Sequence, residues 1–295
     1  MTGNRLYPVG VALVLAALAT TVPAMLPAQR LPSLVLHHLR VGLDSATWRD
    51  VQQSPFLGHE FAARDSIVFD ASGARWMRQL FMGRRQWLEL VQGNGTGSIE
   101  LGLTAEAAGS TPDLVEAWRR KRVVLDSSTV LRGTGDGTEP WYLRWAVMAG
   151  KGAMLGVELD SYHPALFRRL AERDSLPADV MDRARAMQPH FAPDRLFAEI
   201  TGATLAIPVE EIHRLRAALI SGGAVAVVDE GEGLVVVLED GLRLRLVPAW
   251  ERPGIQRLEF YLTRSVPANP SYRLGPRSRF RFGPGRVAVW DFDLP

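Results

Sequence analysis

LVLHHLRVGL, at residues 34–43, is an alternating run that contains two adjacent histidines. In an extended strand, successive side chains point to opposite faces of the sheet. The face expected to join the core carries Val35, His37, Leu39, Val41 and Leu43. The opposite face carries Leu36, His38, Arg40 and Gly42. His38 should therefore point into the space that this second face lines, whereas His37 is expected to be a hydrogen-bonded histidine of the core.

The composition is that of an ordinary globular protein. The chain has 295 residues, of which 47% are hydrophobic and 22% charged, so it is long enough for two modest domains or one large domain. Its 34 Lys and Arg residues are spread along the chain with 32 Asp and Glu residues and form no polybasic block, so we expect no nucleic-acid partner. The absence of cysteine excludes disulfides, thiolate metal sites and a cysteine nucleophile.

Residues 1–28 have the pattern of a signal peptide. Arg5 supplies a positive start, residues 9–18 form a short apolar run, and small residues at 22–24 or 26–28 offer cleavage ends. We therefore expect an exported protein, periplasmic or secreted, with no stable membrane span after the signal is removed. An uncleaved N-terminal anchor is the weaker alternative, because Thr20, Thr21 and Pro23 interrupt an apolar run that is already short for a membrane span.

The rest of the chain repeats one order of elements, a strand, a helix and three strands. The first unit is expected to have strands at 34–43, 66–70, 75–82 and 85–91, with a helix at 45–61 that Pro55 interrupts. The second has strands at 99–103, 123–125, 141–148 and 154–159, with a helix at 111–121. The third has strands at 203–207, 224–229, 234–238 and 242–247, with a helix that starts at Pro208. The fourth has strands at 256–263, 279–282 and 286–292, with a proline-rich loop in place of the helix.

This order predicts an α+β fold built from tandem βαβββ modules. A charged stretch at 164–193, with Pro177 in its middle, reads as a pair of connecting helices between the second and third units. We therefore divide the mature chain into an N-terminal domain at 33–165, a helical linker at 166–196 and a C-terminal domain at 197–295.

Four sequence motifs within these modules indicate a resemblance to a known superfamily. They are LHHLRVGLDSATWRDVQQSPFL at 36–57, WLELVQ at 87–92, EPWYLRW at 139–145 and SYHPALF at 161–167. Together with the module order, they resemble the vicinal oxygen chelate superfamily of glyoxalases, bleomycin-resistance proteins and extradiol dioxygenases, and are similar to an uncharacterised glyoxalase-like family within it. The resemblance covers about residues 34–295 and implies two half-barrel domains of paired modules.

The resemblance also implies a divalent metal ion in the first half-barrel, held by ligands on the first and last strands of its modules. Carried onto this sequence, those positions are His38, Glu89, Glu100 and Glu158. Strand alternation places Glu100 and Glu158 opposite apolar rows, and Glu89 less clearly so. One imidazole and three carboxylates suit Zn, Mn, Fe, Ni or Co. The alternative is that each glutamate simply faces solvent from a half-exposed strand.

The C-terminal domain departs from this ligand pattern. Its first strand, at 203–207, has no histidine, and LRLRLVP at 242–248 has Arg243 and Arg245 where a ligand glutamate would stand. We expect this domain to be a degenerate copy that supports the fold, or that offers an anion a second cleft without a metal.

Two classes of function follow from these expectations. The first is an exported lyase, isomerase or dioxygenase, in which the ion acts as a Lewis acid on a small oxygenated molecule while a carboxylate, Glu158 or Glu89, moves a proton. The second is a non-catalytic protein that binds or sequesters a small molecule on the same scaffold. No nucleophile elbow, P-loop, dinucleotide fingerprint or H-E-x-x-H helix is present to indicate another chemistry.

Overall fold

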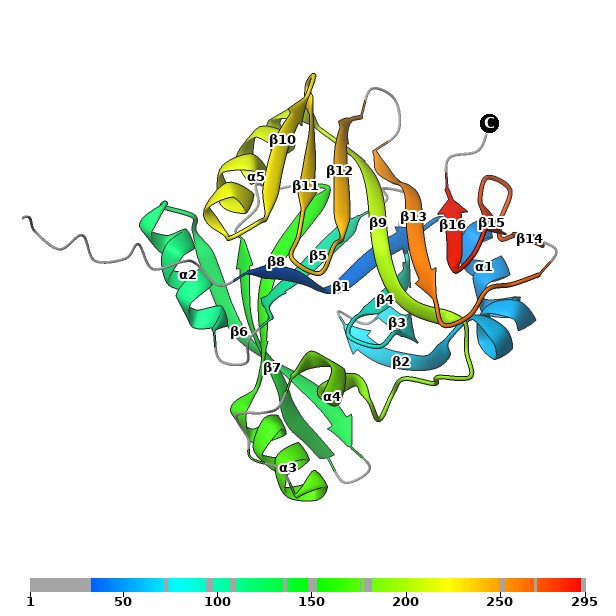
Figure 1. Cartoon of the computed structure of the whole chain (residues 1–295), viewed down its shortest axis with the longest axis horizontal. Helices are drawn as coiled ribbons and strands as arrows, with labels where there is room; N and C mark the ends of the chain where they lie inside the picture. The colour runs from blue at the N-terminus through cyan, green and yellow to red at the C-terminus, as the bar shows by residue number, and fades with distance from the viewer. Residues whose placement is uncertain are drawn as a thin grey trace, which may run out of the picture. The chain divides into compact units, whose positions relative to one another are not determined.

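The described residues form two eight-stranded sheets, each made of two modules (Figure 1). The computed structural model describes residues 33–292 except 72–73, 94–97, 107–109, 135–136, 148–152, 176, 178–181, 250–252 and 268–269. The predicted signal peptide lies outside these residues. Within the described part of the chain, no helix is both long enough and apolar enough to cross a membrane.

The first sheet contains modules one and two. Module one consists of β1 (Leu34–Leu43), α1 (Ser45–Gln53), the π-helical turn η1 (Leu57–Phe61), β2 (Ala63–Ala71), β3 (Ala74–Met82) and β4 (Trp87–Gln92). Module two consists of β5 (Ile99–Ala105), α2 (Thr111–Arg120), β6 (Leu125–Thr134), β7 (Gly137–Val147) and β8 (Leu155–Tyr162). The strand order is β2-β3-β4-β1-β5-β8-β7-β6, so the first strands of the two modules, β1 and β5, lie side by side at the centre.

The second sheet contains modules three and four, after the two helices α3 (Pro164–Asp174) and α4 (Arg183–Met187). Module three consists of β9 (Phe197–Ile207), α5 (Val209–Ser221), β10 (Ala226–Glu230), β11 (Gly233–Val237) and β12 (Arg243–Pro248). Module four consists of β13 (Gly254–Leu262), β14 (Ser271–Arg273), β15 (Arg279–Phe282) and β16 (Val287–Asp291). The strand order, β10-β11-β12-β9-β13-β16-β15-β14, repeats that of the first sheet.

The predicted fold class is confirmed, and the described residues of module four contain no helix. In the first three modules the first and last strands pair in parallel, as β1 with β4, β5 with β8 and β9 with β12. In module four, β13 and β16 pair antiparallel. A parallel pair needs a crossover connection, usually a helix, and the described residues between β13 and β14 form none. The strand predicted at 123–125 is wrong in extent, because β6 begins only at Leu125 and runs to Thr134.

Both sheets contribute one face to a shared apolar core, and the chain from Leu31 onward forms one compact unit. Burying a large apolar side chain in such a core stabilises the fold by about 1.5–3 kcal/mol. The opposite face of each sheet is turned away from this core and is therefore available for a functional site. Among the core residues that the central strands supply are Leu39, Val41, Leu101, Leu103, Val157, Leu159, Leu205, Leu244, Leu258 and Phe260.

The domain division at 33–165, 166–196 and 197–295 stays a prediction. The first sheet ends at Tyr162 and the second begins at Phe197, with α3 and α4 between them. Described residues of both sheets nevertheless belong to one core cluster, so the two sheets share a core across this boundary.

A buried polar contact joins the turn between β11 and β12 to the start of β1. The Leu36 amide donates to Asp240 Oδ2 at 3.0 Å, and the Glu239 amide donates to the Leu34 carbonyl at 2.9 Å. Arg183 of α4 donates to the Leu36 carbonyl, and its Nη2 lies 3.7 Å from Asp240 Oδ2. The side chains of Arg183 and Asp240 are only 3% and 2% exposed, so the charge of Arg183 compensates the buried charge of Asp240.

Asp44 caps the N-terminus of α1, and its replacement by alanine is expected to lower the free energy of unfolding by about 1 kcal/mol at pH 7. Its Oδ1 accepts hydrogen bonds from the amides of Ala46 at 2.9 Å and Thr47 at 3.0 Å. Burial opposes ionisation, but the hydrogen bond from the Thr47 hydroxyl and those from the two amides together outweigh it and lower the pKa of Asp44.

Because the pKa of Asp44 is lower in the folded chain than in the unfolded one, its charge stabilises the fold above the unfolded pKa, and this contribution is lost as the pH falls. Urea unfolding of the wild type and of Asp44→Ala at pH 7 and pH 3 measures the effect. A difference between the two proteins that grows toward pH 3 would contradict it.

Candidate metal centre

A β-bulge in β1 turns both adjacent histidines toward the same side of the first sheet. The pairing of β1 with β5 shifts register between Leu36 and His38. Leu34 and Leu36 therefore join the core before the bulge, and Leu39 and Val41 join it after. The expectation that His37 lies on the core face is wrong, because the extra residue of a bulge reverses the alternation that follows it.

His38 is held between the two strands that flank β1. Its partner on β4 is Trp87, whose ring stacks on the imidazole at 4.9 Å with an interplanar angle of 4°. Its partner on β5 is Gly102, where a Cβ atom would lie 2.2 Å from His38 Nδ1. Only glycine leaves room for the ring at this position, so the sequence of β5 fixes where His38 can be.

Three of the four predicted ligands meet on the face away from the core. His38 comes from β1, Glu100 from β5 and Glu158 from β8. One ligand atom of each lies within 4.8 Å of the other two, and His38 Nε2 is 3.4 Å from Glu100 Oε1. His38 and Glu158 are buried and Glu100 is partly buried. The first sheet thus brings one imidazole and two carboxylates to one point.

Glu89, the fourth predicted ligand, lies on β4 and is held by arginines. Arg40 Nε donates to Glu89 Oε1 at 2.7 Å, and Arg78 Nη1 lies 3.0 Å from the same oxygen. Arg40 also donates through Nη1 to Glu100, so its guanidinium lies between the two carboxylates. Glu89 does not belong to the three-residue group, and its role as a ligand or a proton carrier stays a prediction.

Glu100 and Glu158 share a buried site that favours one negative charge over two. Burial, together with the charge of Glu100, raises the pKa of Glu158 to about 9 against the lowering effect of Arg144. Burial also opposes ionisation of Glu100, but the hydrogen bond with His38 and the charge of Arg40 outweigh it and lower the pKa of Glu100. A proton or a cation at Glu158 therefore relieves the repulsion between the two carboxylates.

Asp160 and His37 complete the cluster, and the sequence analysis did not assign them to it. Asp160 Oδ2 lies 3.2 Å from His37 Nδ1 and 3.4 Å from His38 Nδ1, while Oδ1 accepts from Arg144 Nε at 3.2 Å. These two histidines and Asp160 also have ligand atoms within 4.8 Å of one another. Burial lowers the pKa of His37 to about 4, so its ring is neutral at pH 7. Asp160 could have been found from its position two residues after Glu158, on the same face of β8.

Aromatic side chains close one side of the cluster. His37 has its ring 4.5 Å from that of Trp87, 5.3 Å from Tyr142 and 5.0 Å from Tyr162. Trp87 and Tyr142 belong to a small apolar group that also contains Met187 of α4. The stretch between the two sheets thus helps to cover the cluster on the first sheet.

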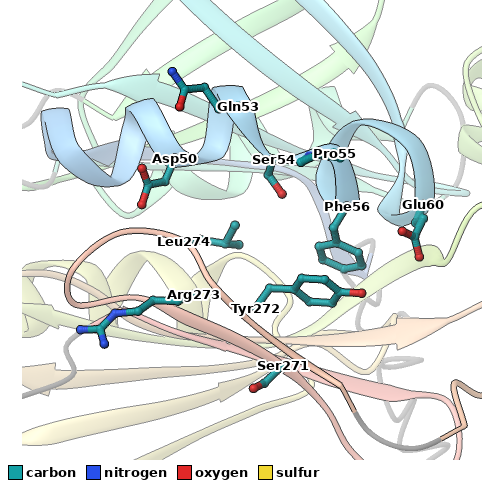
Figure 2. Close-up of a pocket in the computed structure, with 10 residues that line it drawn as sticks. All are labelled: Asp50, Gln53, Ser54, Pro55, Phe56, Glu60, Ser271, Tyr272, Arg273 and Leu274. Carbon is teal, nitrogen blue, oxygen red and sulfur yellow. The ribbon is translucent and has the colours of Figure 1, made fainter.

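A separate cavity of about 520 Å³ lies between α1–η1 and β14 (Figure 2). Phe56 and Tyr272 stack at 3.9 Å on its wall, and Asp50 and Glu60 line it from α1 and η1. None of the predicted ligands lines this cavity, so it is distinct from the cluster around His38.

The corresponding strand of the second sheet carries arginines. Arg243 and Arg245 of β12 are exposed, and Arg245 Nε donates to Glu230 Oε2 at 2.7 Å. Their availability to an anion stays a prediction.

The order of modules and the pairing of their strands define an α+β fold of paired βαβββ modules, with no helix among the described residues of the fourth. A model of a family of unknown function, DUF5829, matches residues 36–292. The chain therefore belongs to the DUF5829 family. No curated protein matches the sequence.

Solved structures with a similar fold include a hypothetical protein from Staphylococcus aureus, at 9% identity and a TM-score of 0.53, with 85% of this chain and 98% of that chain covered. The Mn(II)-bound glyoxalase from Novosphingobium aromaticivorans is 12% identical, with a TM-score of 0.42 and coverage of 88% and 81%. The 2,3-dioxygenase LapB from Pseudomonas sp. KL28 is 11% identical, with a TM-score of 0.42 and coverage of 77% and 74%. Of these three, the first shows a shared fold, and none carries an activity over to this chain.

Proposed function

We propose that the protein binds a divalent metal ion through His38, Glu100 and Glu158 and uses it to act on a small oxygenated molecule. The observation that carries the proposal is the convergence of one imidazole and two carboxylates from three strands, away from the core. The donor set suits Zn, Mn, Fe, Ni or Co.

The charges of the cluster fit such an ion. Glu158 Oε2 is buried and has no hydrogen-bond partner among the described residues, although Arg144 Nη2 lies 2.6 Å away. Glu158 also holds a proton at neutral pH, because burial and the charge of Glu100 raise its pKa. A divalent ion would replace that proton.

The residues around the ion have separate roles in the proposed chemistry. A bound ion supplies Lewis acidity that polarises a substrate oxygen. Glu158 would move a proton when its carboxylate leaves the ion, because burial and the charge of Glu100 raise its pKa when no cation is beside it. Arg40 and Arg144 keep Glu100 and Glu158 oriented, and the aromatic wall around Trp87 excludes water on one side. A lyase, isomerase or dioxygenase reaction would use this combination of a Lewis acid, a carboxylate that moves a proton and a wall that excludes water.

A non-catalytic small-molecule binding protein is the second candidate, and one observation favours it. Arg40 contacts Glu100 and Glu89, while Arg144 contacts Glu158 and Asp160, so the acidic side chains already have positive partners. The negative charges of such a cluster are balanced by the arginines without a metal ion, and the cluster could hold an organic ligand instead. For either function, the pattern at 1–28 supports export to the periplasm or the medium.

Removal of any of the three proposed ligands is expected to weaken metal binding by more than about 100-fold, because loss of a supporting group alone costs about 10–100-fold. Calorimetric titration of chelator-stripped protein with Zn²⁺ and Mn²⁺ compares the wild type with His38→Ala, Glu100→Gln and Glu158→Gln. Glu89→Gln should lose less, since Arg40 and Arg78 hold Glu89.

The control is Glu210→Gln, an exposed carboxylate in the first turn of α5. One equivalent of ion in the wild type, lost in the three ligand variants and kept in the control, supports the metal centre. Wild-type protein that takes up no divalent ion under these conditions favours the binding protein.

A further inference from the structure

We propose that the cavity between α1–η1 and β14 binds a small organic cation, an ammonium group attached to an apolar body. The cavity has a volume of about 520 Å³. Small-molecule sites usually occupy about 300–1,000 Å³, so a ligand of this class fits. The site lies apart from the cluster around His38 and does not depend on the proposed metal function.

An aromatic wall gives the cavity an apolar side. Phe56 and Tyr272 stack at 3.9 Å with an interplanar angle of 5°. Phe56 is buried, and the rings of Phe280 at 5.1 Å and Phe282 at 5.8 Å support it from behind. Tyr272 is only half-buried, and Figure 2 shows Leu274 lining the cavity with it. The apolar body of a ligand would cover this wall and remove apolar surface from water.

The two sides of the cavity are held at a fixed separation. Gly275, in the turn after β14, packs against the start of α1, where a Cβ atom on this glycine would lie 2.8 Å from Thr47 Cα. Its φ of +110° also favours glycine. Asp44 caps α1 and accepts from the Thr47 hydroxyl at 2.6 Å, so the helix side of this contact is itself ordered. A cavity that exists before its ligand arrives costs less to fill.

Two carboxylates line the cavity without a basic partner. Asp50 of α1 and Glu60 of η1 are exposed, and neither forms an ion pair with another described residue. Arg273 is the one basic residue among the described lining residues. Its guanidinium donates to the carbonyls of Gly275 and Pro276, and Figure 2 shows it pointing away from Glu60. The lining therefore leaves two negative charges available to a cation.

Glu60 and the Tyr272 hydroxyl mark the end of the cavity where the ammonium group would bind. Figure 2 shows both at the end away from the Arg273 guanidinium. Burial and the charge of Glu60 raise the pKa of Tyr272, so its hydroxyl is neutral and can accept a hydrogen bond from an ammonium group. Asp50 and Glu60 belong to neither group of described residues that could hold a metal ion, which favours an organic cation.

The test measures the binding of three probes that share one ring and differ in charge: benzylammonium, benzyl alcohol and benzoate. Saturation-transfer NMR titrations of the full chain give a Kd for each. We expect benzylammonium to bind at least about 5-fold more tightly than benzyl alcohol at low ionic strength, and benzoate to bind more weakly than either. About 0.5 M NaCl should remove most of this preference, because salt screens exposed charges.

Two variants separate the charges from the wall. The double variant Asp50→Asn, Glu60→Gln should lower the affinity for benzylammonium to that for benzyl alcohol and leave benzyl alcohol unchanged. Tyr272→Ala should weaken the binding of both probes by about 3–10-fold. The matched controls are Glu210→Gln in α5 and Tyr261→Ala in β13, two exposed residues that do not line the cavity. They should change neither Kd.

Benzyl alcohol or benzoate bound as tightly as benzylammonium would overturn the proposal. So would benzylammonium binding that does not saturate, or a preference for it that survives in the double variant. The two carboxylates are exposed, so their replacement should leave the fold intact. The double variant therefore decides the question even if Tyr272→Ala does not fold.

Discussion

Gly102→Ala is expected to abolish divalent-metal binding while both sheets remain folded. The new Cβ would lie 2.2 Å from His38 Nδ1 and 2.3 Å from Cε1, closer than any van der Waals contact. The imidazole cannot simply move aside, because Trp87 stacks on it and Trp141 stacks on Trp87 at 5.2 Å. Overpacking of this kind costs about 1–3 kcal/mol, and the ring that should bind the ion is displaced.

Gly156→Ala is the control for this substitution. Gly156 lies on β8 in the same sheet, and a Cβ there would first meet Glu100 Cγ at 3.6 Å, an ordinary contact. Metal titration and thermal unfolding of both variants separate the effects. Metal affinity in Gly102→Ala equal to that of the wild type would show that the position of His38 is not needed for binding.

Arg183→Met is expected to lower the free energy of unfolding by about 3–5 kcal/mol at pH 7, because it removes the positive charge beside the buried carboxylate of Asp240 and also the ion pair of Arg183 with Glu106. Asp240 has a side chain that is 2% exposed, and Arg183 lies 3.7 Å from it. The substitution also removes the hydrogen bond from Arg183 to the Leu36 carbonyl at the start of β1.

The pH dependence of this effect has a definite sign. Burial raises the pKa of Asp240, and Arg183 opposes that rise, so the pKa should be higher still in Arg183→Met. A carboxyl whose folded pKa is raised costs stability above that pKa, and the cost disappears as the pH falls through it toward the unfolded pKa. The deficit of Arg183→Met should therefore shrink in acid.

Urea unfolding of the wild type and Arg183→Met at pH 7 and pH 5 measures the deficit. Arg216→Met, which breaks the exposed pair of Arg216 with Asp229, is the control and should change stability little. A deficit that is small at pH 7, or that grows in acid, would contradict the assignment of Asp240 as a buried charge.

Much of the architecture could be predicted from the sequence because each module has local signals. The alternation in β1 predicted its bounds, and the missing helix of the fourth module was visible as a proline-rich loop. The apolar rows of β5 and β8 also placed Glu100 and Glu158 on the face where they lie. The spacing of apolar residues and the positions of turn residues are local signals. They largely determine these elements, so the sequence alone was enough to predict them.

The rest of the site depends on pairing between distant segments. A bulge in β1 is set by its register with β5, so the alternation in β1 alone put His37 on the wrong face. Arg40 and Arg144 reach the glutamates only because their strands are neighbours in the sheet. No spacing along the chain encodes either contact.

The most direct test of the metal centre is a crystal structure of the protein soaked in Mn²⁺ or Zn²⁺, with anomalous scattering measured at the metal's absorption edge. We expect a single strong peak within bonding distance of His38 Nε2 and of carboxylate oxygens of Glu100 and Glu158. A map with no peak there at saturating metal, or with its peak at another set of residues, would contradict it.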